Sequence, residues 1–150
     1  MTLTIETCPF EELYQHPDFQ LWVDQYIEEC RNDKIAVPDF YVEKYREKEA
    51  AGILRTLIAR DGSHLAGAAW LLVTPAAHYD FPLVSVDGFY LRKPWRKGFN
   101  GVNFLQAAKA VAIREGSKGL VFMAPPGSTL DRLCSVLGMV NTHKAYWCAV

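Results

Sequence analysis

A basic segment with two glycines is the part of the chain whose residue types point most directly to chemistry. It holds four cations close together and reads Tyr90-Leu91-Arg92-Lys93-Pro94-Trp95-Arg96-Lys97-Gly98-Phe99-Asn100-Gly101. Helical spacing follows it, and the N-terminus of a helix presents free N–H groups with partial positive charge. Glycine lets the backbone approach an anion, and arginine and lysine add formal charge. The segment therefore predicts a phosphate or pyrophosphate site, with a basic surface turn that caps a helix as the alternative.

The spacing of the glycines excludes the commonest phosphate loops. The chain has no GxxxxGK[ST] motif, so an NTPase loop is excluded. It also has no GxGxxG motif opening a first βαβ unit, which disfavours a Rossmann dinucleotide site. The predicted anion site must therefore be of another kind.

Helices are predicted where apolar residues recur at the spacing of one helix face. This spacing occurs first at Phe19, Trp22, Val23, Tyr26, Ile27 and Cys30, and later at Gly101, Phe104, Leu105, Ala108, Val111 and Ala112. The expected helices cover residues 19–30, about 39–51, 100–115 and 128–137. Ser128 is expected to cap the last of them, with Asp131 at the capping-box position. The acidic residues at 43–49 predict a solvated helix face.

Strands are predicted from apolar runs bounded by turn residues, at 3–5, 53–60, 64–74, 83–91, 119–124 and 143–150. Asp61-Gly62 predicts a hairpin turn. The strand 64–74 is apolar almost throughout, so we expect it to be buried on both faces. Gly88 within the strand 83–91 predicts a bulge or a close backbone approach. The order β-α-α-β-β-β-α-β-α-β predicts one α/β domain over residues 1–150, with a mixed sheet packed against helices.

Composition and charge restrict the class of protein. The 150 residues carry 16 Lys+Arg against 17 Asp+Glu, for a net charge of −1. A nearly neutral chain is not expected to bind nucleic acid in bulk or to bind a membrane surface. The four cysteines, Cys8, Cys30, Cys134 and Cys148, show no CxxC or paired Cys/His spacing, so we expect no metal site. The N-terminus lacks the features of a signal peptide, and the longest apolar run, 65–73, is too short to span a bilayer. We expect a soluble cytoplasmic protein with reduced thiols.

The second half of the chain resembles the GNAT superfamily of N-acyltransferases. The family has a segment of the type Pro-x-(Tyr/Phe)-Arg-Gly-x-Gly-x-Gly between a strand and a helix, and the stretch from Pro94 to Gly101 is similar to it. The stretch from Leu133 to Met139 resembles a later family segment. The resemblance covers roughly residues 83–150, and the first half fits in element order only. Among variants, the Arg-Lys-Gly-x-x-Gly form looks like short proteins encoded by bacteriophages.

The resemblance implies a GNAT-like acyl-CoA N-acyltransferase fold, with a mostly antiparallel sheet, and acetyl-CoA as cosubstrate. The pantetheine arm would lie along the strand at Phe89, Tyr90 and Leu91, like an added strand. The pyrophosphate would lie on the N–H groups of the turn and the first helical residues. The thioester would enter a gap near Gly88, between this strand and the strand at 119–124. The implied pyrophosphate residues are Arg96, Lys97, Gly98, Phe99, Asn100, Gly101 and Val102.

Two departures from the family pattern concern the mechanism. One glycine of the family's turn is missing, because the glycine positions are Phe99 and Gly101 when counted from Arg96, and Gly98 and Asn100 when counted from Trp95. Many members also place a tyrosine in the late helix as general acid to the leaving thiolate, and Cys134 stands there. Cys134 is a weak donor or, alternatively, a small buried hydrophobe. Tyr146 on the last predicted strand is a second donor candidate, with core packing as its alternative.

Acyl transfer also needs a base and a place for the acceptor amine. Asp87 is the acidic residue best placed on the strand 83–91, and we expect it to be buried and to act as base directly or through water. Its alternative role is to satisfy backbone groups at a bulge. His78 and Tyr79, in the loop before this strand, are candidates to line the acceptor pocket, unless the loop is merely solvated. The early aromatic residues should be mostly core, with those around 35–40 able to form a wall of the acceptor site.

The sequence therefore predicts transfer of an acetyl group from acetyl-CoA to an amine, by direct attack in a ternary complex. The acceptor is expected to be a small molecule or a protein, and a homodimer is compatible with the sequence. Two other functions stay open. One is a non-catalytic GNAT-like module that acts by binding, as a virion or regulatory component, and the other is a GNAT-like enzyme that modifies nucleic-acid bases.

Overall fold

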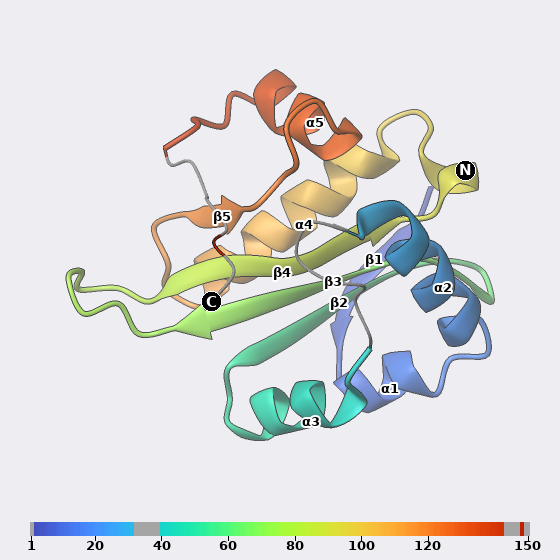
Figure 1. Ribbon diagram of the computed structural model, residues 1–150, viewed down its shortest axis with the longest axis horizontal. Coiled ribbons are helices and arrows are strands. Elements are labelled where there is room, and N and C mark those ends of the chain that lie inside the picture. The colour runs from blue at the N-terminus through green and yellow to red at the C-terminus, as the bar shows by residue number, and fades with distance from the viewer. Residues whose placement is uncertain (1, 32–39, 143–147, 149–150) are drawn as a thin grey trace.

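The computed structural model describes residues 2–31, 40–142 and 148 and shows a five-stranded mixed sheet (Figure 1). The sheet order is β1-β2-β3-β4-β5, in which β4 and β5 are parallel and every other neighbouring pair is antiparallel. The strands are β1 (Thr4–Cys8), β2 (Leu54–Asp61), β3 (His64–Thr74), β4 (Leu83–Leu91) and β5 (Leu120–Phe122). The predicted α/β class and the mostly antiparallel sheet are confirmed.

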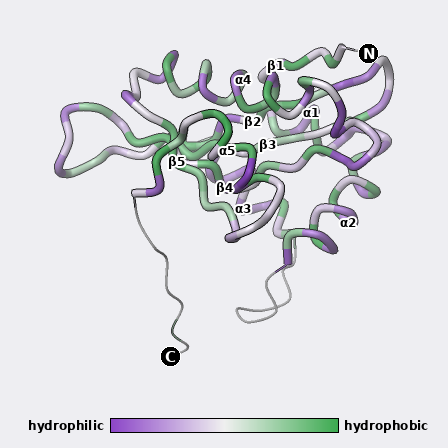
Figure 2. The backbone as a smooth tube through the Cα atoms, turned by 90° about the horizontal axis from the view of Figure 1, so that it is seen from above, coloured by the Kyte–Doolittle hydropathy of each residue, from purple (hydrophilic) through white to green (hydrophobic). Residues whose placement is uncertain are grey.

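Helices cover both faces of this sheet. In Figure 1 the N-terminal helices α1 (Phe10–Tyr14), α2 (Phe19–Cys30) and α3 (Val42–Ala50) lie on one side, and α4 (Asn100–Arg114) and α5 (Thr129–Val136) lie on the other. A short 3-10 turn, η1 (Lys93–Trp95), links β4 to α4. Hydrophobic and hydrophilic residues alternate along α2, as Figure 2 shows, in agreement with its predicted buried face.

The buried residues form two clusters, one on each face of the sheet. The first packs the apolar face of α4 against the sheet, with Phe104 and Val111 beside Leu71 and Val86. The second is aromatic and packs α1 and α2 against the other face, around Trp22 and Trp70. β3 contributes to both clusters, so the prediction that it is buried on both faces is confirmed.

The predicted elements match the structure except near the two ends of the chain. Helix α1 is absent from the prediction because five residues are too few for a periodic pattern. Tertiary contacts hold it instead, with Phe10 and Leu13 buried and the Phe10 N–H donating to Glu49 Oε1 at 2.7 Å. The first strand extends to Cys8 because it pairs with β2 along its length. The predicted strand at 143–150 lies almost wholly outside the described residues.

The predicted hairpin turn and helix cap are both present in the structure. The β2–β3 hairpin turns at Gly62, whose φ of 58° lies in the left-handed region that favours glycine. Ser128 caps α5 by accepting a hydrogen bond from the Asp131 N–H, and the Asp131 carboxylate accepts one from the Gly127 N–H. Among the described residues, none of the four cysteines forms a disulfide. Within the described residues, no helix is long and apolar enough to cross a membrane.

Candidate active site

A β-bulge in the middle of β4 organises the candidate site. Trp70 on β3 pairs with Gly88, but the next residue of β3, Leu71, pairs with Val86, so Asp87 is the extra residue of the bulge. The predicted irregularity at Gly88 is thereby confirmed. A Cβ atom on Gly88 would lie 2.7 Å from the Trp70 ring, so only glycine fits there without a shift of the ring.

The bulge also marks the place where β4 and β5 separate. The two strands pair only from Val84 to Val86 on β4 and from Leu120 to Phe122 on β5. Beyond Asp87, β4 continues to Leu91 with a strand partner on its β3 side alone, within the described residues. An exposed strand edge of this kind can pair with an extended ligand through main-chain hydrogen bonds.

The polar groups on this open edge follow from the pairing of β3 and β4. The Arg92 N–H donates to Ala66 O across the β3 side at 2.8 Å. Because main-chain groups of an antiparallel strand alternate in direction, Phe89 and Leu91 turn theirs to the open side. The Leu91 carbonyl indeed accepts a hydrogen bond from Arg96 Nε at 2.5 Å. The open edge therefore presents the backbone of Phe89 and Leu91, whereas the Tyr90 side chain is buried in the aromatic cluster.

Two of the four cations of the basic segment are engaged within the protein. Arg92 is buried and donates to Gln25 Oε1 and to Leu65 O, at 2.9 and 3.0 Å. Arg96 forms a bidentate ion pair with Glu29, at 2.6 and 2.9 Å. This guanidinium holds the pKa of Glu29 below its ordinary value, although burial acts in the opposite direction. The formal charge available to an anion is therefore smaller than the sequence suggests.

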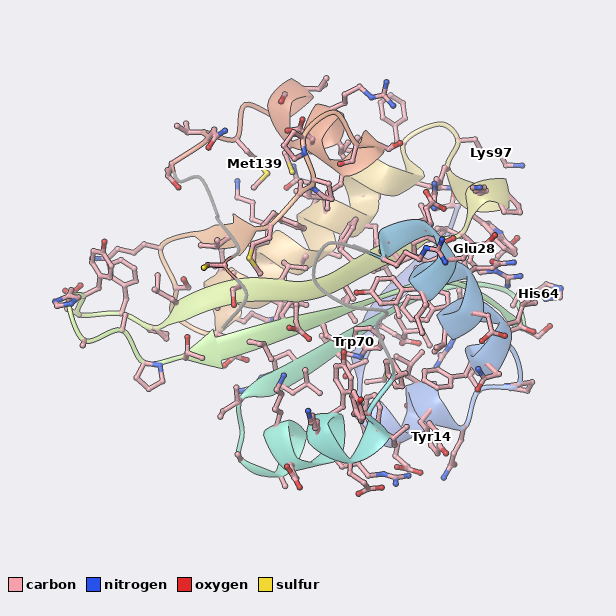
Figure 3. The ribbon with its side chains drawn as sticks, viewed as in Figure 1. Tyr14, Glu28, His64, Trp70, Lys97 and Met139 are labelled. Carbon is pink, nitrogen blue, oxygen red and sulfur yellow. The ribbon has the colours of Figure 1, made fainter. Side chains whose placement is uncertain are left out.

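The remaining cations, Lys93 and Lys97, are exposed. The Lys97 side chain extends outward from the turn that precedes α4 (Figure 3). Gly98 in this turn has a φ of 57°, which allows the chain to reverse into the helix. The first main-chain hydrogen bond of α4 runs from the Asn103 N–H to Phe99 O, so the N–H groups of Gly101 and Val102 precede it at the helix end. These groups and Lys97 lie where the sequence predicts an anion site, and we refer to them as the anion-binding end of the candidate site.

Other predicted residues of the turn have different surroundings. Asn100 is buried and donates its amide to Trp95 O at 3.0 Å, which fixes the turn rather than leaving the side chain for a ligand. Phe99 is 76% exposed. Gly101 faces α5, where Leu133 Cδ2 lies 3.6 Å from the position of a Cβ atom on the glycine.

Asp87 lies at the bulge, as predicted, but it is exposed rather than buried. The extra residue of a bulge leaves the strand ladder, so its side chain points away from the core. Its carboxylate accepts a hydrogen bond from the Tyr45 hydroxyl at 3.4 Å. Tyr26 also reaches the bulge, with its hydroxyl oxygen 3.1 Å from the position of a Cβ atom on Gly88. The bulge therefore brings one carboxylate and two tyrosines together.

The described residues include only one of the two predicted proton donors. Cys134 is half-buried on α5, and burial, with a smaller effect of Asp131, raises the pKa of its thiol. The thiol is therefore protonated at neutral pH but is a weak acid toward a leaving thiolate. Tyr146 lies outside the described residues.

The predicted acceptor residues His78 and Tyr79 are not near the basic turn. They lie in the loop between β3 and β4, which Figure 1 shows projecting from the end of the sheet opposite to η1. Asp80 in the same loop pairs with Lys118, beyond the C-terminus of α4, at 3.2 Å. Because α4 has 15 residues, this loop lies roughly 20 Å from the start of the helix. The structure brings Asp87, the open edge and the turn together and leaves His78 and Tyr79 apart.

Sequence reasoning missed Tyr26, Tyr45 and Glu29 as site residues. The tyrosines fall on helical spacings that equally indicate core packing, and Glu29 is one of several acidic residues on α2. Their long-range partners carry no local signal. Of the loop at 35–40 that was expected to form an acceptor wall, only Phe40 lies within the described residues, and it packs on Trp70 with ring centroids 5.3 Å apart.

Of the comparisons with known proteins, the one with solved structures supports the fold. No protein-family model and no curated protein sequence matches the chain. Solved structures do match. A ribosomal-protein-alanine N-acetyltransferase from Brucella melitensis has a TM-score of 0.75 at 16% identity, covering 100% of this chain and 99% of that one. AAC(6')-Iy, an aminoglycoside N-acetyltransferase, in complex with a bisubstrate analogue of CoA, has a TM-score of 0.74 at 15% identity, covering 100% and 99%.

A third match is a predicted acetyltransferase from Clostridium acetobutylicum solved with acetyl-CoA. Its TM-score is 0.73 at 13% identity, and the match covers 99% of this chain and 96% of that one. These similarities span nearly the full length of each chain and show that the two halves together adopt the acetyltransferase fold. They lend no support to a bacteriophage origin.

Proposed function

We propose that this chain, which has the fold of the GNAT acetyltransferases, transfers an acetyl group from acetyl-CoA to an amine. The observation that carries the proposal is the opening of β4 from β5 at the Asp87 bulge, directly before the turn that leads into α4. Among the described residues, this arrangement puts a strand edge that has no partner in line with a helix N-terminus. An extended amide chain ending in a diphosphate matches both features in order.

The residues present fit such a cosubstrate. The amide groups of pantetheine would pair with the main chain of Phe89 and with the Leu91 N–H on the open edge, since Arg96 already engages the Leu91 carbonyl. The diphosphate would be held by the N–H groups of Gly101 and Val102 and by Lys97. When bound, acetyl-CoA supplies a thioester-activated acetyl group. That group would lie beside the Asp87 bulge, where β4 and β5 separate.

Asp87 is proposed as the base that accepts the proton of the amine, and its exposure allows the acceptor to reach it from solvent. The amine nitrogen then attacks the acetyl carbonyl directly in a ternary complex. For the leaving thiolate, Cys134 is the proposed donor among the described residues, and solvent can also supply the proton. Acceptors of the chemistry named for the similar structures, aminoglycosides and a ribosomal protein, fit an amine, and this chain does not choose between small molecule and protein.

The experiment is acetyl transfer from labelled acetyl-CoA to a panel of small-molecule and peptide amines, read by mass spectrometry. Transfer to any amine that is lost in Asp87→Asn supports the proposal. Binding of acetyl-CoA without transfer to any amine would favour the second candidate, a non-catalytic module. The raised pKa of Cys134 and the engagement of Arg96 by Glu29 are the observations that favour that second function.

A further inference from the structure

Tyr26 and Tyr45 at the bulge have no role in the proposed function, and both lie on the same face of the sheet. Tyr45 comes from α3 and Tyr26 from α2, so both reach the bulge from the face of the sheet opposite to α4. This is the face around Trp70, where Figure 3 shows side chains gathered between the sheet and the N-terminal helices. A ligand chain on the open edge and a ligand on this face would thus meet at Gly88.

Packing holds both tyrosines in place. The Tyr45 ring packs against Trp70 with centroids 4.7 Å apart, and the Tyr26 ring meets the same indole edge-on at 6.0 Å. Trp70 is fully buried and cannot move away without opening the core. The two hydroxyls are therefore carried by a rigid aromatic base and not by flexible side chains.

Both hydroxyls remain protonated over the physiological range. Burial is the main cause that raises the pKa of Tyr26 to about 12, and it raises the pKa of Tyr45 still further, with Asp87 adding to both. Each hydroxyl can therefore donate one hydrogen bond and accept another. The Tyr45 hydroxyl donates to the Asp87 carboxylate at 3.4 Å, which is a long hydrogen bond.

One cation of the described residues lies beside this corner. The Lys48 ammonium already lies 5.6 Å from the centroid of the Tyr45 ring. Aromatic faces attract ammonium ions, and a neighbouring carboxylate adds a full negative charge. A hydroxyl oxygen and a carboxylate together can accept the hydrogen bonds that an ammonium group offers.

We propose that Tyr45 and Tyr26, with Asp87, bind the acceptor as a primary alkylammonium ion, and that Tyr45 positions the Asp87 carboxylate for proton removal. This inference rests on the proposed function. The ammonium loses one proton to the Asp87 carboxylate, and the free amine forms the C–N bond while the C–S bond breaks. The second proton of the nitrogen goes to the leaving thiolate, and Asp87 returns its proton to solvent, so the products are an amide, the CoA thiol and H⁺.

The test compares two probes of equal size on the full chain saturated with CoA, which cannot react. The n-butylammonium ion and butan-1-ol are titrated while the ring resonances of the tyrosines are followed by NMR. We expect the native chain to bind butylammonium at least tenfold more tightly than butanol. We expect Tyr45→Phe and Asp87→Asn each to remove most of this preference, and the double variant to lose no more than Asp87→Asn alone.

Tyr41→Phe is the matched control, because Tyr41 is an exposed tyrosine at the start of the same helix. It should leave the preference unchanged. Equal binding of the two probes by the native chain would overturn the inference, as would additive losses in the double variant. A merely structural role of Tyr45 would weaken both probes equally. Titration of the native chain with acetyl-CoA in parallel distinguishes failure of this inference from failure of the proposed function. A chain that does not bind acetyl-CoA contradicts the proposed function itself.

Discussion

Glu29 on α2 and Arg96 after η1 form a bidentate ion pair that ties the aromatic face of the sheet to the turn before α4. The Arg96 guanidinium also lies 5.0 Å from the centroid of the Tyr90 ring and donates to Leu91 O on the open edge. One side chain thus connects α2, β4 and the anion-binding end of the candidate site. The Arg96 side chain is thus engaged in fixing the turn.

Replacement of Lys97 by alanine should weaken acetyl-CoA binding several-fold, because Lys97 is the exposed cation beside the first N–H groups of α4. The effect should decrease at high salt, since exposed charges are screened. Calorimetric titration at low and high ionic strength measures it. Lys109→Ala, an exposed lysine further along α4, is the control and should change nothing. Unchanged affinity in Lys97→Ala would place the diphosphate elsewhere.

Removal of the Glu29 charge should make the chain less stable near neutral pH. The folded-state pKa of Glu29 lies below its ordinary value of 4.5, so its ionised form adds stability above that value. That contribution is lost as the pH falls through the lower folded-state pKa. The free energy of unfolding of Glu29→Gln should therefore be lower than that of the native chain at pH 7, by up to about 1 kcal/mol. This difference should shrink below about pH 4.5.

Thermal denaturation over this pH range makes the comparison. Glu28→Gln, the neighbouring position, is the matched control because it leaves the Glu29–Arg96 pair intact. A difference between native and Glu29→Gln that does not change with pH would show that the ion pair is not its cause.

A methyl group at Gly88 should disrupt the bulge. The added Cβ would lie 2.7 Å from the buried Trp70 ring, and overpacking of this kind costs about 1–3 kcal/mol. Chemical denaturation of Gly88→Ala measures the loss. Gly119→Ala is a suitable control, because a Cβ there meets no atom within 4 Å. Equal stability of the two variants would mean that the ring and the strand separate easily.

The carboxylate of Asp87 should matter for turnover and not for cosubstrate binding. With an amine found by the acceptor screen, Asp87→Asn should lower kcat by about 10²–10⁴-fold, the usual contribution of general base catalysis. Its affinity for acetyl-CoA should match that of the native chain, because the carboxylate does not lie on the open edge. Native turnover in this variant would remove Asp87 from the mechanism.

The fold was largely predictable because its main elements carry strong local signals. The predicted strands 64–74 and 83–91 are bounded by turn residues and match β3 and β4 in full. Gly88 within the second strand indicated the bulge. The place of the turn from Arg96 to Gly101 between a strand and a helix follows from the sequence because one segment builds it, but the partners of its side chains do not. The carboxylate that engages Arg96 lies 67 residues away, and no local pattern could reveal it.

The surroundings of Asp87 illustrate the same limit. Its place on the strand follows from the sequence, but its exposure results from the register shift between β3 and β4. Likewise, the partner hydroxyl of Tyr45 lies 42 residues from Asp87. Helical spacing identifies Tyr45 as an inward-facing residue without showing that its hydroxyl reaches a carboxylate.

Calorimetric titration of the full chain with acetyl-CoA is the measurement that tests the central claim most directly. We expect saturable one-to-one binding that desulfo or truncated analogues reproduce only in part, since the open edge and the helix end recognise different portions of the cosubstrate. Lys97→Ala should weaken this binding, and Asp87→Asn should not. No heat of binding at millimolar acetyl-CoA would contradict the account, because the gap between β4 and β5 would then serve no acyl donor.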